Sequence, residues 1–302
     1  MVRSIIANCH HNLGRPAILN SWRLVVLMYS ACDLDYDSDK LPALSGIAKT
    51  YQHALEDECL AGLWRSDIGS QLMWRALKLG MRIDGYIAPS WSWASLRGCA
   101  IELSNHMPYE ALIVDVLRIN TTLEGDDVTG KVVDGSLVIK ARLTQITEIR
   151  EKMGSYLFST RNNQSQAIIG VDWDVSGNAR IGLASTKHKL FCVPIRLTWN
   201  SQERMNKLID AHIEGLILDQ ENPEQLEFHR CGTFAVHGLV KSPEDTRLWE
   251  FWHSFDEFDD SSASASLKPE YWNSERGFLQ YNGGSKRYEL ISHVKRYTIT
   301  IK

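Results

Sequence analysis

A change in the spacing of apolar residues near residue 110 constrains the fold more than any other feature. Before this point the apolar positions recur at helical spacing, and after it they alternate in short runs rich in β-branched residues. Turn signals such as Gly125-Asp126-Asp127 separate the runs, and no helical pattern lies between most of them. Because parallel strands need long crossovers, the second part of the chain is predicted to form a largely antiparallel sandwich or barrel.

The predicted strands are short, rich in β-branched residues and bounded by turn signals. They are Ala111–Leu123, Ser136–Ile146, Ala167–Val175, Lys189–Leu197, Ile213–Asp219 and Glu227–Val236, followed by a last strand with Tyr297, Ile299 and Ile301. In the second of these, Leu137, Ile139, Ala141 and Leu143 are predicted to share one buried face.

Three helical regions are predicted from caps and periodicity. Asp39 is a good N-cap for a helix over roughly 40–55, with Pro42 in its first turn. A second helix is expected to carry Leu60, Leu63, Trp64, Ile68, Leu72 and Ala76 on one face and to stop at Gly80. A third, over 243–257, opens at Ser242-Pro243-Glu244-Asp245. The fold class is therefore α+β: helices over roughly 20–85 packed on the sheet, with a C-terminal helix and final strand.

Composition excludes several classes of function. The net charge is -4 and the pI about 6.2, and the 33 Lys and Arg form no run, so binding to nucleic acid is not expected. The apolar run Leu24–Tyr29 is too short to span a bilayer, and Met1–Ala7 makes a poor signal peptide. Six widely spaced cysteines indicate a reducing compartment, so we expect an intracellular, cytoplasmic protein.

Two groups of residues have the chemistry of metal ligands. Cys9-His10-His11 lacks a second ligand pair at zinc-finger spacing. His229 and Cys231 lie two apart and would share a strand face, and Cys192 and His212 also lie in the β-rich part. The alternative is that Cys231 packs in the core as a small apolar residue. We predict no metal site and no cofactor.

Paired carboxylates raise the possibility of acid–base catalysis. Asp172 and Asp174 flank Trp173 and are expected to share a strand face, as glycosidic chemistry would need. The competing interpretation makes them the solvent face of a strand whose Trp173 points inward. No Gly-x-Ser-x-Gly elbow and no glycine-rich nucleotide loop is found. We therefore assign no catalytic residues.

Tryptophans offer the best candidates for a binding or hinge role. Trp91 and Trp93 are separated by one serine after Pro89, so extended backbone directs both indoles to one side. They form either a ligand-stacking platform or a structural rivet between the helical and β parts, with each indole N–H bonded to a carbonyl. Trp64 belongs to the same interface or hinge set.

Several of these blocks together resemble one fungal protein family. The runs Asp39–Ala48, Gly62–Arg65 and Pro89–Ser95, in this order and spacing, resemble the region downstream of the heterokaryon-incompatibility (HET) domain. Trp22, Val26, Tyr29 and Ser30 look like the end of that domain. Its Leu-Ser-Tyr-x-Trp-Gly-like motif and its body, which is similar to TIR domains in fold, are absent, and Ala31–Leu34 departs from the expected Arg-x-Leu-Thr-like pattern.

The resemblance implies a truncated or split family member that holds the accessory region. It divides the chain into a HET-domain remnant over 1–38, a helical segment with a Trp-rich hinge over 39–98, and a β-rich domain over 99–302. The predicted function is a non-enzymatic accessory or recognition module that acts in nonself recognition through protein contacts. The alternative is a small-ligand-binding or hydrolytic β domain that uses Asp172, Asp174, His229 and Cys231, and a gene remnant without independent function is the third option.

Overall fold

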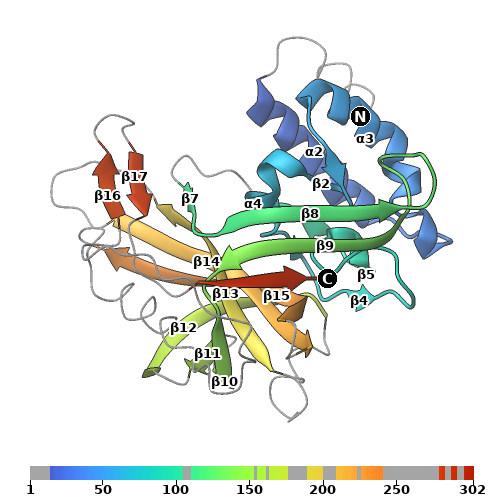
Figure 1. Ribbon diagram of the computed structural model, residues 1–302. Helices are drawn as coiled ribbons and strands as arrows, with labels where there is room; N and C mark the ends of the chain where they lie inside the picture. The colour runs from blue at the N-terminus through green and yellow to red at the C-terminus, as the bar shows by residue number, and fades with distance from the viewer. Residues whose placement is uncertain are drawn as a thin grey trace.

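The computed structural model describes most of the helical part and of the sheet. The described residues are 14–104, 110–152, 155–160, 163–175, 189–199, 209–222, 226–240, 279–282, 287–290 and 296–302. A helical layer covers one part of a large, strongly twisted sheet, as Figure 1 shows. The α+β class is confirmed.

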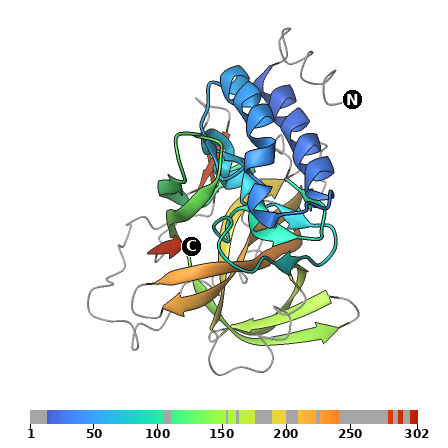
Figure 2. The ribbon, with the colours of Figure 1, turned by 90° about the vertical axis from the view of Figure 1, so that its right-hand side faces the viewer.

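Two antiparallel helices form the outer layer (Figure 2). Helix α2 (Arg15–Ser30) begins beside Pro16 and buries a stripe that includes Ile18, Trp22 and Val26. Helix α3 (Pro42–Leu55) was predicted almost to its ends, and it places Leu44, Ala48, Tyr51 and Leu55 inward. The predicted N-cap was wrong by two residues: Asp39 lies in the turn η1 (Asp37–Asp39), and Leu41 occupies the cap without a side-chain bond.

The second predicted helix is wrong. Residues 59–76 form a tight hairpin of β1 (Cys59–Leu60) and β2 (Leu63–Trp64), the turn η2 (Arg65–Asp67), the short helix α4 (Ile68–Gln71) and β3 (Arg75–Ala76). Ala61 and Gly62 adopt φ angles of 49° and 85°, which end any helix there. Five of the six residues of the predicted stripe are buried; their spacing reflected burial, not helical periodicity.

The segment that follows is irregular and wraps under the helices. It contains β4 (Met81–Arg82) paired with β5 (Leu96–Arg97), the turn η3 (Trp93–Ser95), and β6 (Ile101–Glu102) paired with β3. The prediction that helices continue to residue 85 is therefore wrong.

The main sheet has ten strands in the order β12-β11-β10-β13-β14-β15-β18-β9-β8, with β7 paired to β13. Its strands are β7 (Glu110–Leu112), β8 (Asp115–Leu123), β9 (Val132–Ala141), β10 (Thr144–Lys152), β11 (Ser155–Thr160), β12 (Asn163–Trp173), β13 (Leu190–Trp199), β14 (Ile209–Asn222), β15 (Glu227–Val240) and β18 (Tyr297–Ile301). Among the described strands, all pairings in this sheet are antiparallel except β15–β18. The predicted strands all fall within or across these elements, and β11 was missed.

The alternation predicted for β9 and β18 is confirmed. Leu137, Ile139 and Ala141 are buried, and Tyr297, Ile299 and Ile301 are buried opposite them in register. The described strands do not form a closed barrel. The β10–β12 part is nevertheless joined to the rest of the sheet twice, because β10 pairs with β13 and β12 pairs with β15. A separate antiparallel hairpin consists of β16 (Leu279–Asn282) and β17 (Arg287–Leu290).

One hydrophobic core joins the helices to the sheet. It runs from Ile18 in α2 through Trp64, Trp91 and Trp93 to Ile301 in β18. The predicted C-terminal helix over 243–257 and the Cys9-His10-His11 cluster lie outside the described residues. Among the helices that the structure describes, none combines the length and the apolar character needed to cross a membrane.

Candidate functional site

The three candidate tryptophans lie inside the molecule. Trp64, Trp91 and Trp93 are each 0% exposed. Trp64 packs edge-on against Trp22 of α2 with ring centroids 5.2 Å apart, and Trp93 packs edge-on against Tyr29 at 6.4 Å. These are the arrangements that aromatic pairs prefer in protein cores. In this structure none of the three indoles is open to a ligand.

Hydrogen bonds tie the tryptophan motif to the β1–β2 turn. The Trp93 indole N–H donates to the Gly62 carbonyl at 3.0 Å, and the Ser92 hydroxyl donates to the Ala61 carbonyl at 2.6 Å. The indole nitrogens of Trp64 and Trp91 have no partner among the described residues. The rivet interpretation had expected each indole of the Trp91/Trp93 pair to donate to a carbonyl, and this is right for Trp93 and wrong for Trp91.

A buried ion pair joins the sheet to the layer above it. The Arg230 guanidinium on β15 binds the Asp174 carboxylate through Nε and Nη2, at 3.0 and 3.2 Å, and the two side chains are 0% and 1% exposed. Arg230 also donates to the carbonyls of Leu72 and Trp74 and lies 3.3 Å above the Trp74 ring. A buried ion pair is stable only when its other polar atoms are bonded in this way.

A pocket of about 280 Å³ opens beside this ion pair. Residues of the segment 82–88, which we name the strap, line it. Ser90, Ser95 and Asp134 also line it, together with Asp219, His229 and Cys231 of β14 and β15. Figure 1 shows β4 and β5 beside the C-terminal end of β18, where this pocket lies.

Two of the four residues of the alternative function meet in this pocket. His229 and Cys231 share the predicted strand face and both line it. Burial, with smaller contributions from the charges of Asp219 and Asp174, raises the pKa of the Cys231 thiol to about 12. The thiol is therefore protonated at neutral pH, which makes Cys231 a weak nucleophile.

The two aspartates do not share an environment, contrary to the prediction. Asp174 lies beyond the end of β12 and is bound to Arg230, whereas the Asp172 side chain is 55% exposed and 3.9 Å from Arg75. Trp173 between them is buried, as the competing interpretation had it. The same interpretation predicted that Asp174 faces solvent. This is wrong, because Asp174 is buried and paired with Arg230.

The remaining candidate ligands do not converge on one ion. Cys192 is buried on β13, where burial raises the pKa of its thiol, and it does not line the pocket of His229 and Cys231. Within the described part of the chain, no group of three or more His, Cys, Asp or Glu side chains has metal-binding geometry.

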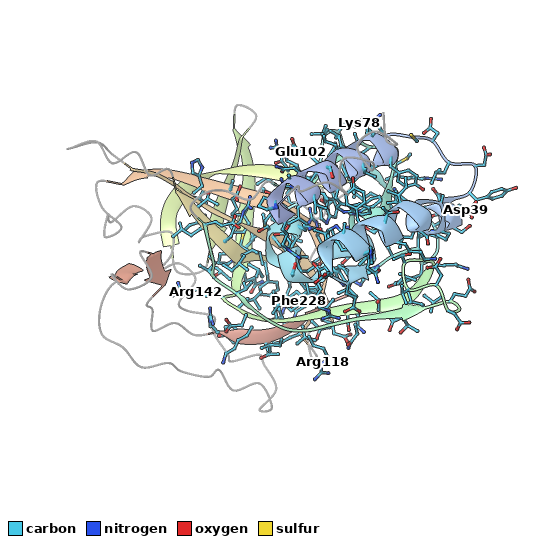
Figure 3. All side chains as sticks on the ribbon, turned by 90° about the horizontal axis from the view of Figure 1, so that it is seen from above. Asp39, Lys78, Glu102, Arg118, Arg142 and Phe228 are labelled. Atoms are coloured by element: carbon cyan, nitrogen blue, oxygen red, sulfur yellow. The ribbon has the colours of Figure 1, made fainter. Side chains whose placement is uncertain are left out.

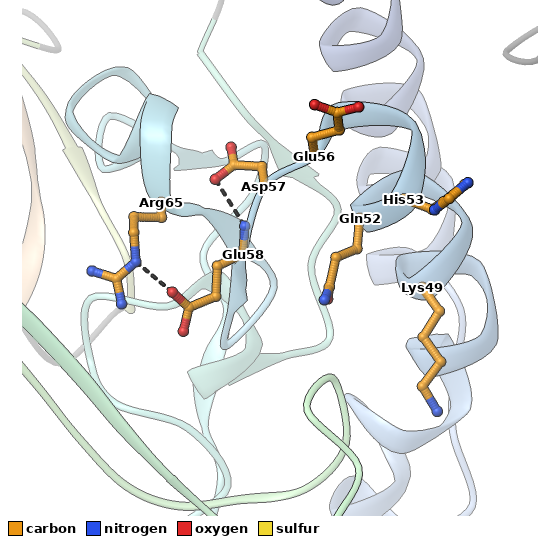
Figure 4. A pocket seen from close by; sticks show the side chains of 7 residues that line it. All are labelled: Lys49, Gln52, His53, Glu56, Asp57, Glu58 and Arg65. Carbon is orange, nitrogen blue, oxygen red and sulfur yellow. Dashed lines mark hydrogen bonds and ion pairs between the residues drawn. The ribbon is translucent and has the colours of Figure 1, made fainter.

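A second depression, of about 610 Å³, lies at the C-terminal end of α3 (Figure 4). Two of its three acidic lining residues are in ion pairs: Asp57 lies 2.7 Å from Arg15, and Glu58 lies 2.5 Å from Arg65. It is an open, charged surface, and exposed ion pairs of this kind contribute little to stability or specificity.

Sequence reasoning missed the two arginines of the site. One signal for Arg230 was present: it has the same strand parity as the buried Phe228, so it had to face inward and needed a buried partner. Nothing comparable marks Arg82, because it lies in a segment without periodicity.

No family model, no curated protein and no solved structure matches this chain.

Proposed function

We propose that this chain is a non-enzymatic accessory or recognition module of a fungal heterokaryon-incompatibility-like protein. In this proposal it acts in the cytoplasm, in nonself recognition, through contacts with another protein. The C-terminal helix over 243–257 would complete the fold, with the strands arranged as a sandwich or barrel. The proposal rests first on the family resemblance of the runs Asp39–Ala48, Gly62–Arg65 and Pro89–Ser95.

One observation carries the proposal: the resembling blocks meet at a single buried junction. Trp93 from the third block bonds to Gly62 in the second, and the Lys40 ammonium from the first lies 5.6 Å from the centre of the Trp93 ring. Burial lowers the pKa of Lys40, and among the described residues its ammonium donates to the Leu96 carbonyl alone. Residues buried at such a junction stabilise the fold, and the surface of the molecule is then the part that contacts a protein partner.

The surface next to the strap supports a role in protein contacts. Leu77, Leu79 and Met81 are 56%, 53% and 54% exposed within five residues of chain. Backbone bonds hold this segment in place, from Leu77 to Ala100 at 2.9 Å and from Gly80 to Asp174 at 2.9 Å. A rigid cluster of exposed apolar side chains is typical of an interaction site.

The test is affinity capture from fungal extract with matched surface variants. Leu79→Glu is expected to abolish capture of any specific partner, because a charge in the centre of an apolar contact is left unpaired. Leu117→Glu is the control: Leu117 is 54% exposed but lies on β8, away from the strap. Equal loss with both variants, or capture unaffected by Leu79→Glu, would count against the proposal.

An enzymatic assay tests the rival class. The purified chain is expected to show neither hydrolase nor NAD-consuming turnover. A specific turnover that Cys231→Ala or His229→Ala removes, without loss of the folded circular-dichroism spectrum, would replace this proposal with the hydrolytic alternative.

A further inference from the structure

Arg82 shares its nearest carboxylate with a second arginine. Its Nη2 lies 3.6 Å from Asp174, the carboxylate that already binds Arg230 through two hydrogen bonds. Two guanidinium groups therefore face one buried carboxylate. Because Arg230 is 0% exposed and the Arg82 side chain is 36% exposed, the excess charge faces the pocket at Arg82.

Arg82 also has unused donors. Its Nη1 donates to the Ser95 hydroxyl at 2.9 Å and its Nη2 to the Arg230 carbonyl. The Nε–H has no acceptor among the described residues, although a guanidinium offers five N–H donors. A carboxylate on the pocket side would accept from this free edge, in the paired geometry that arginine favours.

The same pocket also offers a negative charge. The Asp134 carboxylate is exposed, lines the pocket, and makes no hydrogen bond or ion pair with another described residue. Burial and the charge of Asp134 together raise the pKa of Tyr86, which lines the same pocket. Asp219 and His229, which are cross-strand neighbours on β14 and β15, line it too, as does Lys302. The lining is thus close to neutral and presents both signs of charge.

The strap supplies an apolar wall that can adjust. Ile83, Tyr86 and Ile87 line the pocket, and residues 83–88 make no backbone hydrogen bond with any described residue. Gly85 within the strap has φ of 84° and open space around its Cα. The strap is thus placed by its side chains, and small shifts of it break no backbone bond.

We propose that this pocket binds a small zwitterion with an apolar body, of the class of free aliphatic amino acids. Arg82 receives the carboxylate, Asp134 receives the ammonium group, and Ile83 and Ile87 cover the aliphatic side chain. The volume of about 280 Å³ lies just below the usual range of ligand pockets, which suits a molecule of the size of one amino acid. This site is independent of the protein-contact surface proposed above.

Isothermal titration of the full chain with three probes tests the assignment. The probes are L-leucine, leucinamide, which lacks the carboxylate, and 4-methylpentanoate, which lacks the ammonium group. Leucine is expected to bind at least about tenfold more tightly than either analogue, since each analogue loses one charge-assisted bond.

Two variants assign each charge to one residue. Arg82→Gln is expected to weaken leucine about tenfold and to leave leucinamide unchanged, because the interaction it removes is already missing from that analogue. Asp134→Asn is expected to weaken leucine equally and to leave 4-methylpentanoate unchanged. Asp134 is exposed, so this second variant keeps the test valid if Arg82→Gln unfolds.

Matched controls lie outside the pocket. Arg118→Gln on β8 and Asp126→Asn in the β8–β9 loop change exposed residues of the same types, and Figure 3 shows Arg118 projecting away from the sheet. Both controls are expected to bind leucine like the unaltered chain. The proposal is overturned if leucine does not bind at millimolar concentration, if leucinamide binds as tightly as leucine, or if the controls lose binding to the same extent.

Discussion

Gly62 is the residue on which the tryptophan junction depends most directly. Its φ is 85°, and a Cβ there would lie 2.8 Å from the Trp93 indole nitrogen. Gly62→Ala is therefore expected to destabilise the fold by about 1–3 kcal/mol, through backbone strain and displacement of the indole. Urea unfolding measures this change. Gly46→Ala on α3, where nothing lies within 4 Å of the added carbon, should instead stabilise by roughly 0.5–1 kcal/mol.

The Arg230–Asp174 pair is the second residue-scale feature with a measurable consequence. Arg230→Met leaves the Asp174 charge buried with only Arg82 nearby, at 3.6 Å, and should cost about 3–5 kcal/mol. The double variant Arg230→Met with Asp174→Leu removes both charges and should recover much of that loss. A single variant within about 1 kcal/mol of the unaltered chain would show that water or Arg82 fully compensates.

At the scale of elements, the tip of the β8–β9 hairpin is clamped to α3. Asp127 accepts from the Ser45 hydroxyl at 2.7 Å and from Lys49 at 2.9 Å, and from the Thr129 amide and hydroxyl, both at 3.0 Å. These bonds, of which the one from Ser45 has the largest effect, hold the pKa of Asp127 well below its ordinary value of 3.8.

This clamp predicts a pH dependence of known sign. Because the pKa is lowered on folding, the carboxylate contributes stability above about pH 4 and loses it as the pH falls toward the lower, folded value. Asp127→Asn should therefore lower the melting temperature at pH 7, and the difference from the unaltered chain should shrink below pH 4. Asp126→Asn in the same loop serves as the control. A difference that stays constant with pH would rule out the charge as its cause.

The elements that the sequence predicted correctly are those in which local signals and burial agree. In α3, Pro42 and the inward positions Leu44, Ala48 and Tyr51 point to the same helix, and the alternation of β9 matches its single buried face. Residues 59–76 failed because nearly every residue there is buried from all sides, so apolar spacing carried no information on periodicity. The turn between β1 and β2 depends on the positive φ angles of Ala61 and Gly62, and an alanine in a sequence does not predict a positive φ.

For the whole molecule, the single core predicts one cooperative transition. The core cluster joins α2, α3, the tryptophan junction, β8, β9, β13, β14, β15 and β18. Tryptophan fluorescence, to which five of the ten tryptophans contribute from the helical side, and far-ultraviolet circular dichroism should therefore give coincident urea midpoints. Two separated midpoints would mean that the helical layer unfolds by itself.

The candidate site illustrates what sequence alone leaves open at this scale. The shared face of His229 and Cys231 was predictable from strand parity. Their meeting with Arg82 and Asp134 was not, because this depends on how an irregular segment about 150 residues earlier folds back onto β15. Long-range placement of this kind has no local signal.

The position of β18 has a consequence for synthesis of the chain. This strand lies between β15 and β9 in the sheet, and beyond it Lys302 accepts a bond from the Ser90 amide. While the ribosome is still translating residues before 297, β9 and β8 have no neighbour on that side, and the hydrogen-bonding edges of β9 and β15 are uncovered. The nascent protein therefore carries open strand edges until β18 has emerged and paired, and chaperone protection matters most during that interval.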